Sequence, residues 1–257
     1  MGNGRTIAVA NQKGGVGKTT TAVNLSACLA QMGKKTLIVD IDPQGNTTSG
    51  LGVDKKKLDK TIYNVLLGEC FITDVLRETS VPGLTIAPAD MQLAGAEIEL
   101  VTQGSREHIL SKILRDIKFT YDYVIIDCPP SLNILTVNAL TATDTVLVPL
   151  QCEFYALEGL TQLLHTVDLI KKRLNNRLKL EGIVFTMYDG RTNLSLQVVD
   201  EVKRFVPKDI YKCIVPRNVR LSEAPSHGLP ITLYDKSSKG AEAYMQLAEL
   251  VDTSEVM

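Results

Sequence analysis

Residues 6–20 read TIAVANQKGGVGKTT, an apolar run followed by a glycine-rich segment and a lysine–threonine pair. The apolar run predicts a buried strand, and apolar side chains at helical spacing follow it through Leu25 and Leu29 to Gly33. In a strand, glycine-rich loop and helix of this order, successive backbone N–H groups can surround phosphate oxygens at the positive end of the helix dipole. The segment therefore predicts a phosphate-binding loop.

The end of this loop carries the two side chains that a nucleoside triphosphate requires. We expect Lys18 to bridge the β and γ phosphates and the Thr19 hydroxyl to ligate Mg²⁺. An ordinary glycine-rich turn between a strand and a helix is the alternative interpretation, and the lysine–threonine pair in this context disfavours it. The residues expected to hold the nucleotide here are Lys13, Gly14, Gly15, Val16, Gly17, Lys18, Thr19 and Thr20.

Carboxylates follow two further apolar runs. The run at 36–40 ends in Asp40, with Asp42 two residues later, and the run at 123–127 ends in Asp127. A spacing of two places Asp40 and Asp42 on one side of a strand, and α/β sheets bind ligands at the carboxyl ends of their strands. Two acids beside a phosphate loop repel each other unless a cation lies there. An apolar strand that ends in an acid is a Walker B arrangement, so Asp127 is expected to hold the water shell of Mg²⁺.

Strand-like runs alternate with helical stretches along the whole chain. This alternation predicts an α/β fold with a single doubly wound, mainly parallel sheet flanked by helices, and no linker divides the chain, so residues 1–257 are expected to form one domain. A helix with Leu157, Leu160 and Ile170 on one face is expected to pack on this sheet, and 42–59 reads as a long polar loop. The expected strands are Thr6–Ala10, Thr36–Asp40, Leu84–Ala87, Tyr123–Asp127, Thr145–Leu150, Glu181–Thr186 and Tyr211–Val215.

The charge balance excludes a chain that is basic throughout. Of 257 residues, 44% are hydrophobic, which is enough for a full core, and 28 basic against 29 acidic residues leave a net charge of −1. Residues 164–222 nevertheless carry twelve basic and six acidic residues, a net charge of +6 against −7 elsewhere. Any nucleic acid would therefore be bound by a local patch, although most single lysines in this region read as part of a solvated surface.

The five cysteines are widely spaced and include no CxxC pair, which disfavours a disulfide framework, a zinc site or a metal cluster. They are expected to be reduced thiols in or near the core. No apolar run reaches the length of a membrane-spanning helix, and a signal peptide is not evident. The sequence therefore predicts a soluble, intracellular protein.

Three segments resemble a known family. KGGVGKT at 13–19, DIDPQGN at 40–46 and IVPRNVRLSEAP at 214–225 are similar to the motifs of the ParA/Soj partitioning ATPases, which have a deviant Walker A loop. The resemblance implies ATP and Mg²⁺ as cofactors and an ATP-dependent homodimer. It implies that Lys13 reaches the partner subunit's phosphates, that Asp42 orients or activates the attacking water, and that Asp40 lies near Mg²⁺ without ligating it directly. The residues that it places at the adenine are Pro216, Arg217 and Asn218.

The same resemblance implies partners. They are non-specific double-stranded DNA and a centromere-binding ParB-type protein that stimulates hydrolysis, and some family members also regulate a replication initiator. The expected location is the cytoplasm of a bacterium, on the nucleoid. The residues expected to contact DNA are Arg191 and Arg220, with Lys203 and Arg204 as weaker candidates.

A division-site regulator of the MinD type, which cycles on a membrane, shares the nucleotide motifs and is the alternative. That family has a basic amphipathic helix at its C-terminus, whereas residues 247–257 contain acids and no lysine or arginine, so anionic lipid would repel them. The prediction is therefore a partitioning ATPase without a membrane partner. A metabolic or cluster-assembly ATPase is disfavoured by the missing CxxC pair.

Overall fold

The computed structural model describes residues 4–206 and 210–254. Within them, an eight-stranded sheet has the strand order β3-β4-β2-β5-β1-β6-β7-β8, and its neighbouring strands are parallel except for the pair β3 and β4. The strands are β1 Arg5–Val9, β2 Thr36–Asp40, β3 Arg77–Glu78, β4 Leu84–Ala87, β5 Tyr123–Asp127, β6 Thr145–Gln151, β7 Lys179–Tyr188 and β8 Ile210–Pro216. The predicted fold class is thus confirmed.

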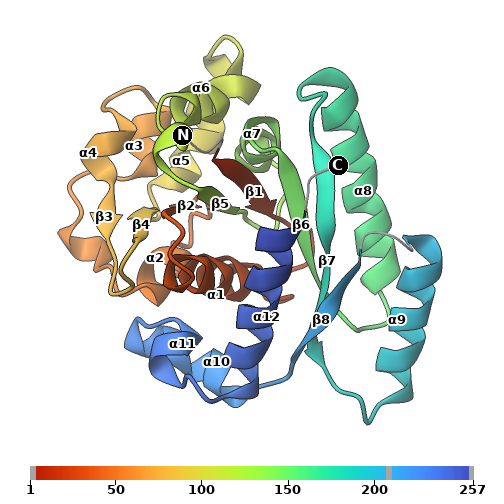
Figure 1. Ribbon diagram of the computed structural model, residues 1–257. Helices are drawn as coiled ribbons and strands as arrows, with labels where there is room; N and C mark the ends of the chain where they lie inside the picture. The colour runs from red at the N-terminus through yellow and green to blue at the C-terminus, as the bar shows by residue number, and fades with distance from the viewer. Residues whose placement is uncertain (1–3, 207–209, 255–257) are drawn as a thin grey trace.

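Helices connect these strands and cover the sheet (Figure 1). The α-helices are α1 Lys18–Gln31, α2 Asn46–Gly50, α3 Ile62–Leu66, α4 Ile72–Val75, α5 Leu93–Glu99, α6 Ile109–Arg115, α7 Ile134–Ala142, α8 Ala156–Arg173, α9 Asn193–Phe205, α10 Val219–Glu223, α11 Ile231–Tyr234 and α12 Lys239–Thr253. The 3-10 helices are η1 Lys55–Lys57, η2 Leu100–Thr102, η3 Arg106–His108, η4 Lys118–Thr120 and η5 Ala224–His227.

The sheet is buried on both faces, because alternate residues of its strands enter different apolar clusters. In β1, Ile7 and Val9 pack with α1 and α12, whereas Ala8 faces the cluster that α5 to α9 complete. Figure 1 shows α1 and α12 side by side, and their contact is among the most extensive between helices. The result is three layers, helix–sheet–helix, as expected for a doubly wound sheet.

The position of β1 determines where a ligand can bind. β1 lies between β5 and β6; the chain passes first to β2 on one side of β1 and later to β6 on the other. The carboxyl end of β1 therefore lies at a topological switch point, where open α/β sheets bind their ligands. The glycine-rich loop begins directly after this point.

The predicted strands are confirmed to within two residues at each end. The two-residue strand β3 is absent from the prediction, because so short an edge segment has no detectable periodicity. The prediction of a continuous polar loop over 42–59 is wrong, because α2 and η1 lie within it. α8 buries the predicted apolar face and ends at Arg173. The five cysteines are free thiols, four of them buried, as predicted.

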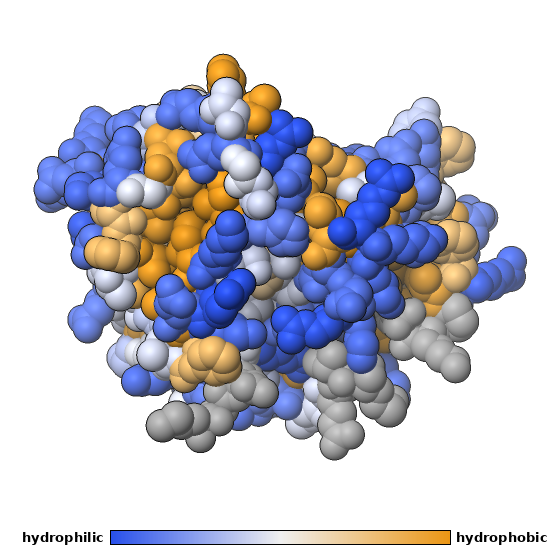
Figure 2. All heavy atoms as spheres, turned by 90° about the horizontal axis from the view of Figure 1, so that it is seen from above, coloured by the Kyte–Doolittle hydropathy of each residue, from blue (hydrophilic) through white to orange (hydrophobic). Residues whose placement is uncertain are grey.

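The surface carries both apolar and hydrophilic side chains. Figure 2 shows one face on which apolar side chains gather in separate areas among hydrophilic ones, the largest of them left of centre. Across the described residues, the most exposed large apolar side chains are Phe71, Ile98 and Phe154. They come from segments far apart in the sequence, so exposure of this kind does not by itself identify a functional surface.

Candidate nucleotide site

The loop between β1 and α1 has the backbone of a phosphate cradle. Gly15 has φ +76° and Gly17 has φ +87°, the left-handed region that favours glycine. Gly17 directly precedes α1, and the first turn of α1 carries no acidic side chain. The positive end of the helix dipole and the free N–H groups of the first turn therefore remain available to an anion.

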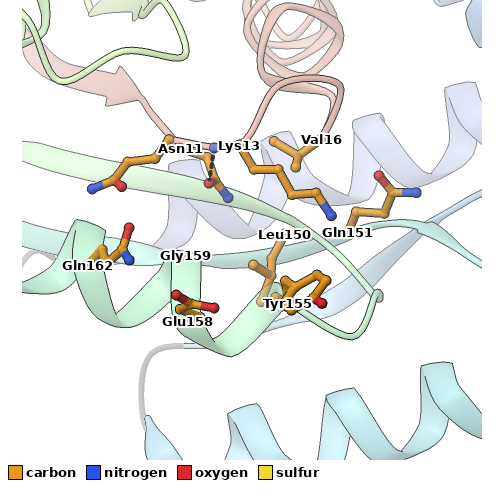
Figure 3. Close-up of a pocket in the computed structure, with 11 residues that line it drawn as sticks. Asn11, Lys13, Val16, Leu150, Gln151, Tyr155, Glu158, Gly159 and Gln162 are labelled. Carbon is orange, nitrogen blue, oxygen red and sulfur yellow. Dashed lines mark hydrogen bonds between the residues drawn. The ribbon is translucent and has the colours of Figure 1, made fainter.

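Side chains from other strands hold this loop in place. The Asn11 side chain donates a hydrogen bond to the Pro149 carbonyl (2.8 Å) and accepts one from the Lys13 N–H (3.0 Å; Figure 3). The Thr186 hydroxyl donates to the Val16 carbonyl (2.8 Å), joining the end of β7 to the loop. Sequence reasoning missed these anchors, because partners 138 and 170 residues apart leave no local pattern.

A cavity of about 340 Å³ opens beside the loop. It brings together three glycines with Lys18, Thr19 and Asp42, which stay predicted nucleotide contacts. The residues that line it are Gly14, Gly15, Gly17, Lys18, Thr19, Thr20, Asp42, Gln44, Asn46, Pro130 and Met187. Lys18 is only 6% exposed and donates to the Lys13 carbonyl (3.0 Å). Burial lowers the pKa of Lys18, and the nearby Asp127 and Asp42 oppose that shift.

The carboxylates at the strand ends differ in their surroundings. Asp40 and Asp127 are fully buried register partners on β2 and β5. Burial raises the pKa of both carboxyls, and the proximity of Asp40 raises that of Asp127 further. β2 ends at Asp40, so the expectation that Asp42 shares its strand face is wrong: Asp42 lies in the following turn, where its N–H donates to Asp40 (3.2 Å) and its carboxylate accepts from the Gln44 N–H (2.9 Å).

The residues around Asp127 fit a magnesium ion. One oxygen, Oδ1, is buried without a hydrogen-bond partner among the described residues, while Oδ2 accepts a hydrogen bond from Thr47 (2.7 Å). The hydroxyl of Thr19 lies close enough to this carboxyl to lower its pKa. An unpartnered buried carboxylate oxygen beside a threonine hydroxyl and a phosphate loop is a suitable donor set for Mg²⁺ and its waters.

The third predicted segment forms a second cavity of about 330 Å³. Pro216, Arg217 and Asn218, which the family resemblance places at the adenine, line it together with Gly17, Thr20, Thr186, Met187, Val215, Leu221, Ser222, Pro225 and Tyr244. Gly17, Thr20 and Met187 line both cavities, so the two are adjacent. Met187, a non-glycine residue with φ +49°, was missed by sequence reasoning because a left-handed methionine has no sequence signal.

Lys13 does not point into the phosphate cavity of its own chain. Its ammonium group forms an ion pair with Glu153, at the β6–α8 corner, and both side chains are partly exposed. Figure 3 shows the Lys13 side chain extending toward Gln151, at the mouth of a further cavity of about 330 Å³ that includes Tyr155. The two lysines of the loop, Lys13 and Lys18, are only five residues apart, yet Lys18 lines the phosphate cavity and Lys13 lies outside it.

The predicted DNA-contacting residues lie at two separate places. Arg191 follows β7 and Arg220 lies on α10 after β8, and the two loops are joined by a hydrogen bond from the Arg217 N–H to the Tyr188 carbonyl (3.2 Å). Lys203 and the adjacent Arg204 lie near the other end of α9, about 15 Å from its start. The four residues therefore do not form one continuous cluster.

Acidic neighbours accompany both arginines. Arg191 donates to both carboxylate oxygens of Asp189 (2.8 and 2.6 Å), which lowers the pKa of Asp189 to about 2. Arg220 pairs with Glu223 (2.9 Å) and Asp235 (3.5 Å). Another basic residue of the 164–222 region, Lys208, lies outside the described residues.

Comparison with known proteins agrees with this geometry. Residues 4–180 match a family described as an AAA domain. The chain is 58% identical over 248 residues to the sporulation initiation inhibitor protein Soj of Bacillus subtilis, covering 96% of this chain and 98% of Soj. It is 56% identical over 244 residues to the chromosome partitioning protein ParA of Myxococcus xanthus, covering 95% of this chain and 86% of that ParA.

A solved structure has a fold similar to that of this chain. Cobyrinic acid a,c-diamide synthase from Mycobacterium smegmatis with bound ADP and magnesium superimposes with a TM-score of 0.85 at 40% identity, covering 96% of this chain and 94% of the synthase. The ADP and magnesium of that structure are consistent with ATP and Mg²⁺ as the cofactors of this chain. By its sequence relatives and by the motifs that line its cavities, this chain belongs to the ParA/Soj family of chromosome-partitioning ATPases.

Proposed function

We propose that this chain is a DNA-partitioning ATPase. It binds ATP with Mg²⁺, and hydrolysis of the ATP resets the protein to single chains. The observation that carries the proposal is the adjacency of the phosphate cavity and the base pocket around Gly17, Thr20 and Met187. One nucleotide could thus place its phosphates beside Lys18 and its base beside Pro216 and its neighbours. Family relatives named as partitioning proteins support the cellular role.

The residues of the phosphate cavity suit an in-line attack of water on the γ-phosphate. Lys18 neutralises charge on the β and γ phosphates, and its burial strengthens that interaction because water screens it little. Asp42, held by the Gln44 N–H, orients or activates the attacking water. When bound, Mg²⁺ would be held by Thr19 and, through its waters, by Asp127, and would stabilise charge on the phosphates, with Asp40 behind Asp127.

A second copy of the chain completes the phosphate site by supplying its Lys13. Lys13 is directed away from its own phosphate cavity and toward the surface, so it is free to serve a second subunit once its ion pair with Glu153 opens. A cation supplied by a partner stabilises charge on the transferred phosphoryl group only in the pair. ATP would thereby favour a homodimer, and hydrolysis would return single chains.

Non-specific duplex DNA is the proposed surface on which the dimer acts. Arg191, in the loop after β7, and Arg220, on α10, are exposed, with Lys203 and Arg204 on α9 as further contacts. Two copies double the phosphate contacts, so ATP-dependent pairing strengthens DNA binding. A ParB-type protein stimulates hydrolysis, a replication initiator is a further candidate partner, and the proposed location is the bacterial nucleoid. Residues 1–257 act as one domain in this proposal.

The structure offers no support for the membrane-cycling alternative. In α12, Tyr244, Leu247 and Val251 are buried against the sheet and α1, so its apolar face is already covered. α12 carries Glu242, Glu249 and Asp252 against Lys239. Across the described residues, every helix is too short or too polar to cross a bilayer.

The ATP hydrolysis rate of the full chain tests the proposal. We would measure it alone, with duplex DNA, with the N-terminal peptide of a ParB-type protein, and with both, using Lys18→Ala as the inactive control. We expect DNA and peptide together to raise the rate by more than the sum of their separate effects. A rate that is indifferent to both would reject partitioning as the function.

A further inference from the structure

Two adjacent threonines on α2 each hydrogen-bond one of the buried carboxylates. The Thr47 hydroxyl donates to Asp127 Oδ2 (2.7 Å), and the Thr48 hydroxyl and N–H donate to Asp40 Oδ2 (2.7 and 2.9 Å). All four residues are fully buried. The two carboxylates lie on neighbouring strands, so α2 contacts both β2 and β5 through hydroxyl groups.

α2 is held by these contacts rather than by its own stability as a helix. It spans only Asn46–Gly50, and so short a helix is unstable without tertiary contacts. Gly45, directly before it, has φ +61°, and a Cβ there would lie 2.6 Å from the Ala89 carbonyl oxygen. The Ala89 N–H in turn donates to the Thr48 hydroxyl (2.9 Å). The position of α2 therefore depends on its tertiary contacts, which include those to the two carboxylates.

α2 also follows the turn that carries Asp42. The Gly45 N–H donates to the Asp42 carbonyl (2.8 Å), and α2 begins at the next residue. Asp42 lies only four residues before the first residue of α2. A displacement of α2 from the carboxylates would therefore also move the turn that carries Asp42. Asp42 and Asn46 both line the phosphate cavity, so this turn is part of the cavity wall.

Thr47 also determines which oxygen of Asp127 is available. By occupying Oδ2, its hydroxyl leaves Oδ1 as the oxygen without a partner among the described residues. A cation with its waters would satisfy that oxygen and hold the carboxylate in the orientation that Thr47 requires. Cation binding and docking of α2 therefore stabilise the same side-chain geometry.

We propose that Thr47 and Thr48 are positioning residues that couple Mg²⁺ binding at Asp127 to the placement of the Asp42 turn. This inference rests on the proposed function, because it takes Mg²⁺-nucleotide as the ligand. Neither threonine is among the residues that line the phosphate cavity. They act through the carboxylates on one side and the Asp42 turn on the other.

Amide hydrogen exchange of residues 46–50 tests the coupling without relying on turnover. The full chain is compared with ADP and EDTA against ADP and Mg²⁺, because the nucleotide's own contacts are present in both samples. In the wild type we expect Mg²⁺ to slow this exchange about tenfold, the effect of one hydrogen bond to a charged group. Thr47→Val keeps the side-chain shape but removes the donor, and its Mg²⁺ response should fall below about twofold.

Two further variants make the comparison specific. Thr47→Ser keeps the hydroxyl and should restore the wild-type response. Thr141→Val removes a buried hydroxyl on α7 that has no hydrogen-bond partner among the described residues, and should leave the response unchanged. The fluorescence change of a labelled ADP, measured in the same samples, reports nucleotide binding independently.

Each outcome decides the proposal. It is overturned if Thr47→Val shows the wild-type response, or if wild-type protein binds ADP with Mg²⁺ and its exchange at 46–50 does not change. If Thr47→Val does not fold, the wild-type comparison alone decides. If wild-type protein binds no ADP at all, the proposed function fails and this inference fails with it.

Discussion

The nucleotide edge of the sheet and the basic region 164–222 hold their charged groups in opposite ways. At the nucleotide edge, Asp40 and Asp127 are fully buried and hydrogen-bonded by hydroxyls from α2. In the basic region, the Arg191 side chain is 89% exposed and its charge is paired with Asp189, two residues away. Burial fixes geometry and amplifies electrostatic interactions, whereas exposed pairs are screened and individually weak.

The exposed ion pairs of the basic region change how its net charge is interpreted. The +6 balance of the basic region suggests a strong patch, yet Arg191 and Arg220 each carry acidic partners that would have to be exchanged for DNA phosphates. DNA binding by one copy should therefore be weak and sensitive to salt. Substitutions at the nucleotide edge should have large effects, and those in the basic region small ones.

Lys13 is an exception to this contrast. It is partly exposed and ion-paired, like the arginines of the basic region, but it belongs to the phosphate loop. We expect Lys13→Ala to lower ATP turnover by about 1,000-fold, as for other cations supplied in trans, while ADP affinity changes less than about twofold. Steady-state turnover and equilibrium binding of labelled ADP measure the two effects.

Glu153→Gln is the matched control for Lys13→Ala, because it removes the same ion pair and leaves the lysine in place. Its turnover should stay within about threefold of wild type, as expected for loss of a partly exposed ion pair. Equal losses in the two variants would show that the ion pair, and not a lysine acting on the partner, is what matters.

Asp42→Ala tests the buried side of the comparison. Loss of the group that orients or activates water should lower turnover by about 100-fold, while ATP binding and pairing persist. Asp54→Ala is the control, since Asp54 caps η1 outside the cavity and its loss should leave turnover unchanged. Rapid-quench measurement of phosphate release separates the two. Unchanged turnover in Asp42→Ala would discard its proposed role.

The smallest effect is expected in the basic region. Arg191→Glu should reduce duplex-DNA affinity only a few-fold with ATP and lower the slope of log affinity against log salt by about one per subunit. Asp189→Asn frees the same arginine and should strengthen binding slightly. Fluorescence anisotropy over a salt series measures both. Identical slopes in wild type and Arg191→Glu would exclude Arg191 from the DNA contact.

Residues that act through a local pattern could be predicted from the sequence. The glycine-rich loop, Lys18, Asp127 and the alternation of strands and helices all follow from spacing within about 20 residues, and the structure brings the first three to one edge. The proposed base pocket, lined by residues 216–218, required the family resemblance, because a turn after a strand does not reveal what it binds.

Residues that act through long-range contacts could not be predicted. Thr47 and Asp127 lie 80 residues apart, and the Thr186 anchor of the loop lies 170 residues from Val16. Neither pair has a periodicity or motif that connects its members. The acidic partners Asp189 and Glu223 lie close to their arginines in the sequence, but a net charge summed over 164–222 does not show the pairing of Asp189 and ends one residue before Glu223.

The central claim, that ATP pairs two copies of this chain, is tested most directly by sedimentation velocity of Asp42→Ala with Mg²⁺. We predict that the mass doubles from 28.1 kDa with ATP and stays at 28.1 kDa with ADP. A single chain under both conditions, with ATP bound, would contradict it.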